Sequence, residues 1–595
     1  MTRGFLKAHK ADFVFSSGND YNRIEMRRMS MLRLLAPHVF VVLLLGALSW
    51  AGTKGALPFL DAKEAAAASM PEPQPLQTPK SAPSEDKQSK DEQAKDEQAK
   101  AKQAKDKPTS TGDSGKMTLE ELKEAIEHKI SPPQGAQGYW QPIPYTDHEV
   151  PNAMGPPEMS CKEALGLVPD KPPPPTRPKR PRETEPTPAM EQLAQITVGE
   201  DAYDPAQLPG ANPEELPPQL LEGKPEDLAR VGKVMRRMKQ GERIRMSFFG
   251  ASHTGGDWFT GHLRRVLQGR HGDLGHGFIM PAALYKGYRG TDINLCRTDE
   301  WFPDWVGKRD GRDDGLLGFT GMSVSSQDPD QFGWIETTHS NKRGRSVGYY
   351  DIWTVAYPDG GTLLVRIDDA DPIIEIPTRA ASPTLLRTRI RVPEGPHRIS
   401  MSPAGNGETR IVGVFTEREG PGVLVDAIGI RGRTAKTWLS WNEEMHGRGL
   451  ATLDPDLVAL AYGTNEANAM RYTTDAYRKD LRAVLARIRK ALPDAACVLL
   501  GPSDRGVKVK GKDDTFAVWD RTEPFAQVQR EVAAEYGCVF WDWQQASGGP
   551  GSMLAWRFHD PKLAAGDLIH FTKAGYELSA ERFLEALEHA QANNR

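Results

Sequence analysis

The second half of the chain alternates short apolar runs with longer amphipathic stretches, and this alternation restricts the fold more than any other feature. Short apolar runs between turn residues are typical of buried strands, whereas a 3.6-residue period indicates helices. Their alternation predicts a doubly wound α/β sheet with parallel strands and helices on both faces. The predicted strands are 246–249, 423–428, 457–461, 497–500 and 539–541, and the predicted helices are 227–238, 474–492, 525–536 and 573–589.

Residues 297–422 interrupt this alternation. They contain no long helical period, but several short runs in which apolar and polar residues alternate between Gly and Pro turns. Period-2 runs predict an inserted β-sandwich. Trp334 and Trp353 favour a carbohydrate-contacting surface there, and surface hairpins without a function of their own are the alternative. The clearest runs are 348–353, 362–367, 386–392 and 411–415.

Residues 54–224 have the composition of a charged, Pro-rich linker with too few large apolar residues to build a core. The sequence at 90–94 repeats at 95–99, and Lys171 opens a run of four prolines. We predict a tether that holds the folded part away from its anchor. A capping-box pattern at 118–121 predicts one short helix to about residue 128.

An apolar run at 34–51 is about long enough to span a bilayer. Positive charge before it predicts a cytoplasmic segment at 1–33, a signal-anchor at 34–53 and an exported remainder. A cleaved signal peptide, and therefore a secreted protein, is the alternative. Met26, Met29 and Met31 are alternative starts of the chain. The positive residues are Arg23, Arg27, Arg28 and Arg33.

Charge and cysteine usage exclude several classes of protein. The net charge of −4 gives no reason to expect nucleic acid, so no such partner is predicted. Cys161, Cys296, Cys497 and Cys538 are too few and too scattered for a disulfide framework or a zinc site. We interpret Cys497 and Cys538 as buried free thiols, and a Cys161–Cys296 bridge has no support in the sequence. No metal and no cofactor are predicted.

Two short motifs, far apart in the chain, carry residues suited to nucleophilic catalysis. Ser252 lies in Gly-Ala-Ser-His-Thr between a predicted strand and a helical stretch, a turn that exposes a hydroxyl beside backbone amides. Asp567 and His570 are three residues apart, so one turn can present both side chains. Taken alone, Ser252 is a helix cap and the Asp–His pair a surface hydrogen bond. Together they predict a Ser/His/Asp triad.

Four blocks in order resemble the SGNH (GDSL-like) hydrolase family. They are 250–253 around Ser252, 429–434 around Gly432, 463–466 around Asn465, and 567–570. The arrangement is most similar to periplasmic peptidoglycan O-acetylesterases with an inserted β-domain, and the resemblance covers about 243–290 and 423–590. It implies a flavodoxin-like, three-layer hydrolase domain built from 225–296 and 423–595, with the β-sandwich at 297–422 between its two parts.

The resemblance also implies a role for each block. Ser252 is the expected nucleophile, His570 its base, and Asp567 the group that orients the imidazole. The N–H groups of Ser252 and Gly432 and the side-chain amide of Asn465 are the expected oxyanion hole. Taken singly, Gly432 and Asn465 are ordinary turn or cap residues.

One residue near the motifs, Ala251, departs from the family pattern, and three histidines and one tryptophan near the motifs are interpreted separately. Ala251 stands where the family usually has aspartate, which makes the bracing of the serine turn, and hence the rate, the point to test. We expect His253 to brace the loop, and His276 and His559 to be structural. Trp556 is the candidate for stacking on a sugar ring, with core packing as the alternative.

The sequence therefore predicts a serine esterase that removes O-acetyl groups from a cell-envelope glycan, with peptidoglycan as the expected substrate by resemblance. The resemblance places it on the periplasmic side of the inner membrane. Its predicted partners are the O-acetylated polysaccharide and the membrane that holds the N-terminal segment. An O-acetyltransferase with the same triad and a catalytically weak glycan-binding scaffold are the alternatives.

Overall fold

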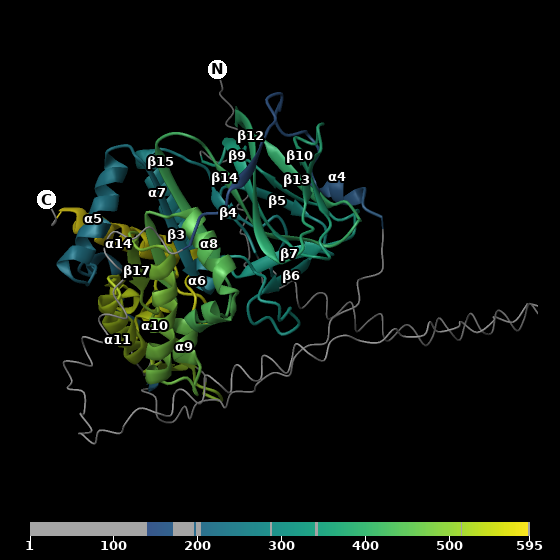
Figure 1. Cartoon of the computed structure of the whole chain (residues 1–595). Coiled ribbons are helices and arrows are strands. Elements are labelled where there is room, and N and C mark those ends of the chain that lie inside the picture. The colour runs from purple at the N-terminus through teal and green to yellow at the C-terminus, as the bar shows by residue number, and fades with distance from the viewer. Residues whose placement is uncertain are drawn as a thin grey trace, which may run out of the picture. The chain divides into compact units, whose positions relative to one another are not determined.

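The computed structural model describes residues 140–169, 195–197, 204–285, 288–339, 343–512 and 514–592. These residues form two main parts (Figure 1). One is a parallel sheet covered by helices, and the other is a β-sandwich. The predicted cytoplasmic segment 1–33, the signal-anchor 34–53 and the short helix at 118–128 lie outside the described residues.

The parallel sheet contains five strands within the described residues. Their spatial order is β15-β3-β16-β17-β20. The second of these strands in chain order, β15, therefore lies at the edge of the sheet, next to the first, β3. This is the flavodoxin-like order, so the predicted doubly wound fold is confirmed. The strands are β3 (Arg243–Gly250), β15 (Gly422–Gly429), β16 (Leu457–Ala461), β17 (Ala496–Leu500) and β20 (Val539–Trp541).

Helices cover both faces of this sheet because its strands are apolar on both sides. In β3, Met246 and Phe248 lie in one core, whereas Phe249 lies in the other. The first core receives α5 (Pro225–Lys239), α7 (Trp258–His271) and α14 (Lys573–Ala592); the second receives α8 (Glu443–Leu453), α10 (Thr474–Ala491) and α11 (Thr522–Glu535) (Figure 1).

The inserted region is a β-sandwich, as predicted. Among the described residues one sheet has the order β1-β12-β9-β14-β7-β6, with β4 paired to β14, and the other the order β11-β10-β13-β8-β5. Apart from β1, its strands begin at Gly277, before the predicted boundary. They are β1 (Tyr145–Glu149), β4 (Gly277–Ile279), β5 (Asn294–Arg297), β6 (Phe302–Trp305), β7 (Met322–Ser326), β8 (Gly333–Glu336), β9 (Val347–Ala356), β10 (Thr362–Ile367), β11 (Ile374–Pro377), β12 (Thr384–Gly395), β13 (Arg398–Pro403) and β14 (Thr409–Glu417).

The predicted linker contains folded segments, which corrects its interpretation. β1 pairs in parallel with β12, and Ile143 and Val150 on either side of it are buried in the sandwich core. A short helix, α4 (Cys161–Gly166), contacts β5. Further along, β2 (Gln195–Thr197) pairs with β19 (Thr515–Val518), which also pairs with β18 (Gly506–Lys508). The β1–β12 and β2–β19 pairings join residues more than 200 apart in the chain, so no local pattern shows them.

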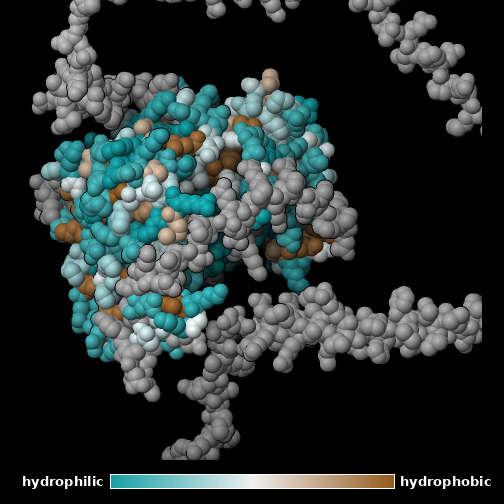
Figure 2. Space-filling view, turned by 90° about the horizontal axis from the view of Figure 1, so that it is seen from below, coloured by the Kyte–Doolittle hydropathy of each residue, from teal (hydrophilic) through white to brown (hydrophobic). Residues whose placement is uncertain are grey.

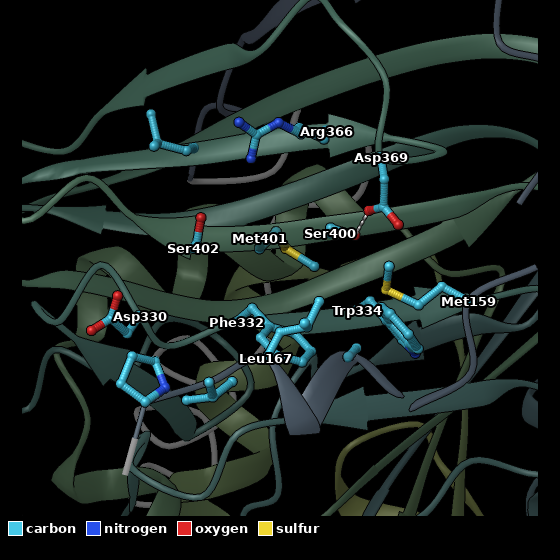
Figure 3. A pocket seen from close by; sticks show the side chains of 14 residues that line it. Met159, Leu167, Asp330, Phe332, Trp334, Arg366, Asp369, Ser400, Met401 and Ser402 are labelled. Carbon is cyan, nitrogen blue, oxygen red and sulfur yellow. Dashed lines mark hydrogen bonds between the residues drawn. The ribbon is translucent and has the colours of Figure 1, made fainter. Parts of the chain in front are cut away.

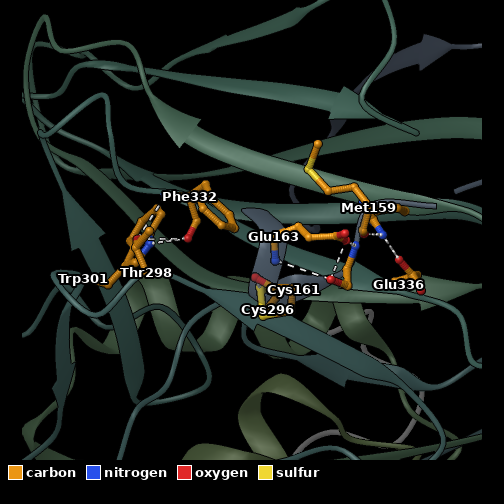
Figure 4. The surroundings of a disulfide bond; sticks show 10 residues. Met159, Cys161, Glu163, Cys296, Thr298, Trp301, Phe332 and Glu336 are labelled. Carbon is orange, nitrogen blue, oxygen red and sulfur yellow. Dashed lines mark hydrogen bonds and ion pairs between the residues drawn. A yellow bond between two sulfur atoms is a disulfide. The ribbon is translucent and has the colours of Figure 1, made fainter. Parts of the chain in front are cut away.

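The cysteines form two disulfides, so the prediction of buried free thiols is wrong. Cys161 of α4 is bonded to Cys296 of β5, with their Cα atoms 5.4 Å apart (Figure 4). Cys497 of β17 is bonded to Cys538, just before the neighbouring strand β20, at 4.6 Å. The parallel sheet brings the second pair together, and the docking of α4 brings the first.

A cluster of charges joins the β-sandwich to the parallel sheet. Glu417 of β14 is 3% exposed and forms ion pairs with Arg243 and Arg245 of β3. It also accepts a hydrogen bond of 2.6 Å from Tyr349 of β9. Removing one member would leave a buried charge uncompensated, which is costly, so these contacts favour a fixed junction.

The coloured part of the face shown in Figure 2 is mainly hydrophilic. On the face shown in Figure 2, hydrophobic residues form only small, separate patches. None of the described helices has both the length and the apolar character needed to cross a bilayer.

Candidate active site

Ser252 lies where β3 ends and the short helix α6 (Ser252–Gly255) begins. The strand must turn sharply there, and Gly250 permits it. A Cβ on Gly250 would lie 2.2 Å from Thr254 Oγ1 and 2.8 Å from the carbonyl oxygen of Ala461. The close approach of β16 therefore requires glycine and leaves the Ser252 side chain at the carboxyl end of the sheet.

Asp567 and His570 reach Ser252 from the loop before α14. His570 Nε2 lies 2.8 Å from Ser252 Oγ, and His570 Nδ1 lies 2.7 Å from Asp567 Oδ2. Leu568 between them has φ +57° and is buried, which closes the turn. The sequence-predicted triad residues are thus brought together in hydrogen-bonding order.

The Asp567 carboxylate is held in its charged form. Partial burial opposes this, but hydrogen bonds from the His570 imidazole and from the N–H groups of His570 and Ile569 hold the pKa of Asp567 well below its usual range. The two backbone bonds to Oδ1 are 3.0 and 3.1 Å long. A carboxylate fixed in this way orients the imidazole and stabilises its protonated form.

Three hydrogen-bond donors lie on the loops that follow β3, β15 and β16. The N–H groups of Ser252 and Gly432 have no hydrogen-bond acceptor among the described residues. Asn465, in α9 (Thr464–Asn468), donates one Nδ2–H to the carbonyl oxygen of Arg433 at 2.9 Å, which ties its amide to the Gly432 loop. Gly432 has φ +71°, and an added Cβ would meet open space, so its backbone conformation is what favours glycine.

These donors surround the carboxyl ends of β3, β15 and β16, the first three strands of the parallel sheet in chain order. In a doubly wound sheet the strand order reverses here, and ligands bind outside the carboxyl ends at such a switch point. A serine paired with a histidine, beside convergent N–H donors, can attack a carbonyl carbon and stabilise the resulting oxyanion.

Comparison with known proteins agrees with this fold. The model of the GDSL-like Lipase/Acylhydrolase family matches residues 401–578, which include Gly432, Asn465, Asp567 and His570. This match supports a hydrolase similar to the GDSL-like acylhydrolases. Ser252 lies outside the matched range because the β-sandwich separates the first strand of this hydrolase from the others.

Solved structures extend the comparison. A peptidoglycan O-acetylesterase aligns over 65% of this chain and 99% of its own, with 24% identity and a TM-score of 0.51, which shows a shared fold. A putative GDSL-like lipase from Parabacteroides merdae covers 28% of this chain and 72% of its own at 20% identity, with a TM-score of 0.23. A family two carbohydrate esterase from Clostridium thermocellum covers 44% and 93% at 11% identity, with a TM-score of 0.21. No curated protein matches the chain.

Glu466 is a site residue whose role the sequence did not reveal. Its carboxylate is fully buried and accepts hydrogen bonds from the N–H of Gly463 at 2.9 Å and the N–H of Ala435 at 2.7 Å. Burial raises the pKa of Glu466 to about 7, against the effect of these bonds. Glu466 thereby joins the turn before α9 to the Gly432 loop. Its position in the Gly-Thr-Asn-Glu block was the only signal.

His253 braces the site of this hydrolase, as expected. Its Nδ1 lies 2.8 Å from Tyr576 Oη and its Nε2 lies 3.2 Å from Ser503 Oγ. The ring centroid is 5.3 Å from that of His570. Burial, together with the neighbouring His570, lowers the pKa of His253 to about 3, so this second imidazole is neutral at physiological pH.

The turn around Ala251 is held by backbone hydrogen bonds. The carbonyl oxygen of Ala251 accepts from the N–H of Gly255 at 2.9 Å, and that of Gly250 accepts from Ile430 of the neighbouring loop at 2.9 Å. The Ala251 side chain is 4% exposed, within the apolar core. The structure thus contains a brace for the serine turn that needs no aspartate at this position.

The other two histidines named from the sequence, His276 and His559, are peripheral to the triad. His276 is buried 3.8 Å from Asp257, and His559 Nδ1 lies 2.9 Å from the carbonyl oxygen of Pro561. Neither is bonded to the triad, which agrees with a structural role. The described residues hold no cluster of side chains suited to a metal ion.

The tryptophan predictions are corrected by burial. Trp556 has no exposed surface and lies 5.2 Å from the ring of Phe571, so it belongs to the core and offers no face to a sugar. Trp353 is 2% exposed. Trp334 is 5% exposed, with the guanidinium of Arg398 3.7 Å from its ring centroid. Sequence shows that a tryptophan is present, but only packing decides whether its face is open.

Proposed function

We propose that this hydrolase is a serine esterase that removes O-acetyl groups from a cell-envelope glycan, with O-acetylated peptidoglycan as its substrate. The observation that carries the proposal is His570, whose two ring nitrogens lie within 2.8 Å of Ser252 Oγ and Asp567 Oδ2. The adjacent N–H donors of Ser252 and Gly432 complete an arrangement suited to acyl transfer.

In the first half of the reaction, His570 Nε2 accepts the proton of Ser252 as its Oγ attacks the carbonyl carbon of the acetyl ester. The carbonyl oxygen becomes an oxyanion, which accepts hydrogen bonds from the N–H of Ser252, the N–H of Gly432 and the side chain of Asn465. Collapse of this intermediate breaks the bond to the sugar oxygen. His570 protonates that oxygen, and an acetyl group stays on Ser252.

In the second half, water replaces the sugar. His570 removes a proton from the water as it attacks the acetyl carbonyl, and the same donors hold the second oxyanion. Collapse releases acetate and returns the proton to Ser252 Oγ. Asp567 keeps the imidazole oriented and stabilises its positive charge in both halves.

Two observations support an envelope glycan as the substrate. A solved structure that aligns over 65% of this chain is that of a peptidoglycan O-acetylesterase. The two disulfides favour an oxidising compartment outside the cytoplasm. The periplasm, with the apolar run at 34–51 as an inner-membrane anchor, is therefore part of the proposal.

The test measures acetate released from O-acetylated peptidoglycan and from a chromogenic acetyl ester by the full chain and by Ser252→Ala. We expect release from both substrates and a loss of at least about 1,000-fold on substitution, because the nucleophile is removed. Asn442→Ala is the matched control, since Asn442 caps α8 and does not contact the triad.

The other outcomes separate the alternatives. Release that survives Ser252→Ala would overturn the triad, and no release from either substrate would favour a glycan-binding scaffold. Acetyl transfer to added oligosaccharide faster than hydrolysis would identify an acetyltransferase. Release from the chromogenic ester alone would keep the esterase and reject peptidoglycan.

A further inference from the structure

A cavity of about 400 Å³ lies on the β-sandwich, between α4 and the outer face of the sheet β11-β10-β13-β8-β5. Strands β8, β10 and β13 supply its floor, and none of the triad residues lines it. Figure 3 shows Leu167, Phe332 and Trp334 on one side of the cavity, with Arg366 and Asp369 across from them. The esterase chemistry described above does not use this cavity.

The apolar lining is mainly aliphatic and sulfur-containing. Beside Phe332, it includes Leu167, Leu364 and the two methionines Met159 and Met401. Trp334 also lines the cavity, but it is 5% exposed and the guanidinium of Arg398 lies over its ring. A sugar ring would therefore find no open tryptophan face to stack on, whereas small aliphatic side chains match this lining.

The charges at the rim have opposite signs. Arg366 of β10 has no ion pair or hydrogen bond among the described residues. Asp369 is partly compensated, because it accepts from Ser400 Oγ at 2.6 Å and lies 3.1 Å from Arg398. Asp330 is a second carboxylate in the lining. A ligand with a free carboxylate and an amino group is complementary to this arrangement.

The walls of the cavity are fixed in place. The Cys161–Cys296 disulfide bonds α4 to β5 (Figure 4), and Ser160 and Glu163 form a capping box at the start of α4. Arg398 donates to the carbonyl oxygen of Met159 at 2.8 Å. A cavity with preformed walls avoids much of the ordering cost of binding.

We infer that this cavity binds a short peptide with small aliphatic side chains, its free carboxylate paired with Arg366 and its amino group near the rim carboxylates. The identity of the peptide rests on the proposed function: the short peptides attached to the glycan in peptidoglycan contain alanine and free carboxylates. Because their N-terminus is bonded to the glycan, the amino group meant here is the side-chain amine of a diamino residue. The cavity would then hold a peptide stem while the triad acts on an acetyl group elsewhere on the polymer.

The experiment measures binding of the free tetrapeptide released from peptidoglycan by an amidase, using the full chain with Ser252→Ala and calorimetric titration. Glycan strands freed of peptide, and the tetrapeptide amidated at its carboxylates, serve as comparison ligands. We expect the free tetrapeptide to bind, and amidation to weaken it about tenfold or more, because a charge-assisted hydrogen bond is lost.

Two substitutions localise the binding. Arg366→Ala is expected to weaken the tetrapeptide about tenfold or more, whereas Arg379→Ala, which removes a guanidinium of the same sandwich outside the cavity, leaves it unchanged. Replacing Cys161 and Cys296 together with serine frees α4 and is expected to weaken binding. The same replacement in the chain that retains Ser252 is expected to leave cleavage of the chromogenic ester intact. Thermal unfolding of each variant confirms that it is folded.

Equal binding by Arg366→Ala and the parent chain would overturn the inference. So would binding of the peptide-free glycan with no binding of the tetrapeptide, which would assign a carbohydrate to the cavity. Because the tetrapeptide contains no ester, this result is independent of acetate release, and failure of either proposal is visible without the other.

Discussion

The hydrolase sheet and the β-sandwich use polar residues in opposite ways. In the sandwich, Asp351 of β9 bonds to Arg387 and Arg389 of the adjacent strand, so these charges satisfy one another across the sheet. In the hydrolase region, polar residues gather beyond the strand ends and keep exposed surface, with Asp567 50% and His570 30% exposed. The first arrangement holds strands together, whereas the second leaves groups free to react.

The difference explains why the two regions tolerate change differently. Mutually paired charges contribute to a fixed structure, and removing one partner leaves the other buried. Open donors contribute little to folding but can stabilise charge that develops in a reaction. Substitutions at the strand ends of the hydrolase sheet should therefore alter rate, and those in the sandwich should alter stability or binding.

Among the substitutions that test this difference between the two regions, Asn465→Ala is expected to have the largest effect. Loss of one oxyanion donor should lower kcat about 100- to 1,000-fold on a chromogenic acetyl ester, with a small change in KM. Steady-state kinetics measures both. Asn442→Ala is the control, since it should cost about 1 kcal/mol of stability through the α8 cap without changing kcat. Equal loss of kcat in both variants would reject the assigned role of Asn465.

The two disulfides give an intermediate test. Replacing Cys497 and Cys538 with serine should lower the stability of the hydrolase region by about 2–5 kcal/mol, because this bond joins β17 to the start of β20. The same change at Cys161 and Cys296 should leave cleavage of the small ester intact. Denaturant unfolding, followed beside ester cleavage, distinguishes the pairs. Loss of ester cleavage in the second variant alone would contradict the separation of the two regions.

A smaller effect is expected for Glu466→Gln. Replacing one carboxylate oxygen by an amide nitrogen removes an acceptor for the N–H of Gly463 or Ala435, so the Gly432 loop should shift and kcat should fall about tenfold. Glu443→Gln, at the exposed start of α8, is the control. An unchanged kcat would show that Glu466 does not position the oxyanion hole.

Glu466 also makes stability depend on pH in a defined window. Its pKa is raised by burial from 4.5 to about 7. Between these values the folded chain binds the proton that the unfolded chain has released, so the contribution of Glu466 to stability falls as pH rises and is constant above pH 7. Thermal unfolding of Glu466→Gln between pH 4.5 and 7 should lack this component. An identical slope in both chains would contradict the assignment.

The sequence predicted the hydrolase sheet well because its signals are local. Runs such as β17 are short, apolar and bounded by turns, and each motif follows one of them directly. The geometry then brought Ser252, Asp567 and His570 to one place, as their spacing and order had indicated.

What the sequence did not reveal depends on contacts between distant residues. β1 gains its stability from pairing with β12, and α4 from a disulfide to Cys296, so neither shows in the composition of the predicted linker. The burial of Trp556 follows from the packing of Phe571 against it. The Gly-Thr-Asn-Glu block marks the position of Glu466 but not its role, because that role depends on a loop about 30 residues away in the chain.

The central claim is that Ser252 carries the acyl group during turnover. Rapid quenching of the reaction with a chromogenic acetyl ester, followed by peptide mass spectrometry, measures this intermediate directly. We predict one acetyl group on the peptide that contains Ser252, and none on that peptide in Ser252→Ala. Acetate release without any acetyl group on Ser252, or with the acetyl group on another residue, would contradict the mechanism.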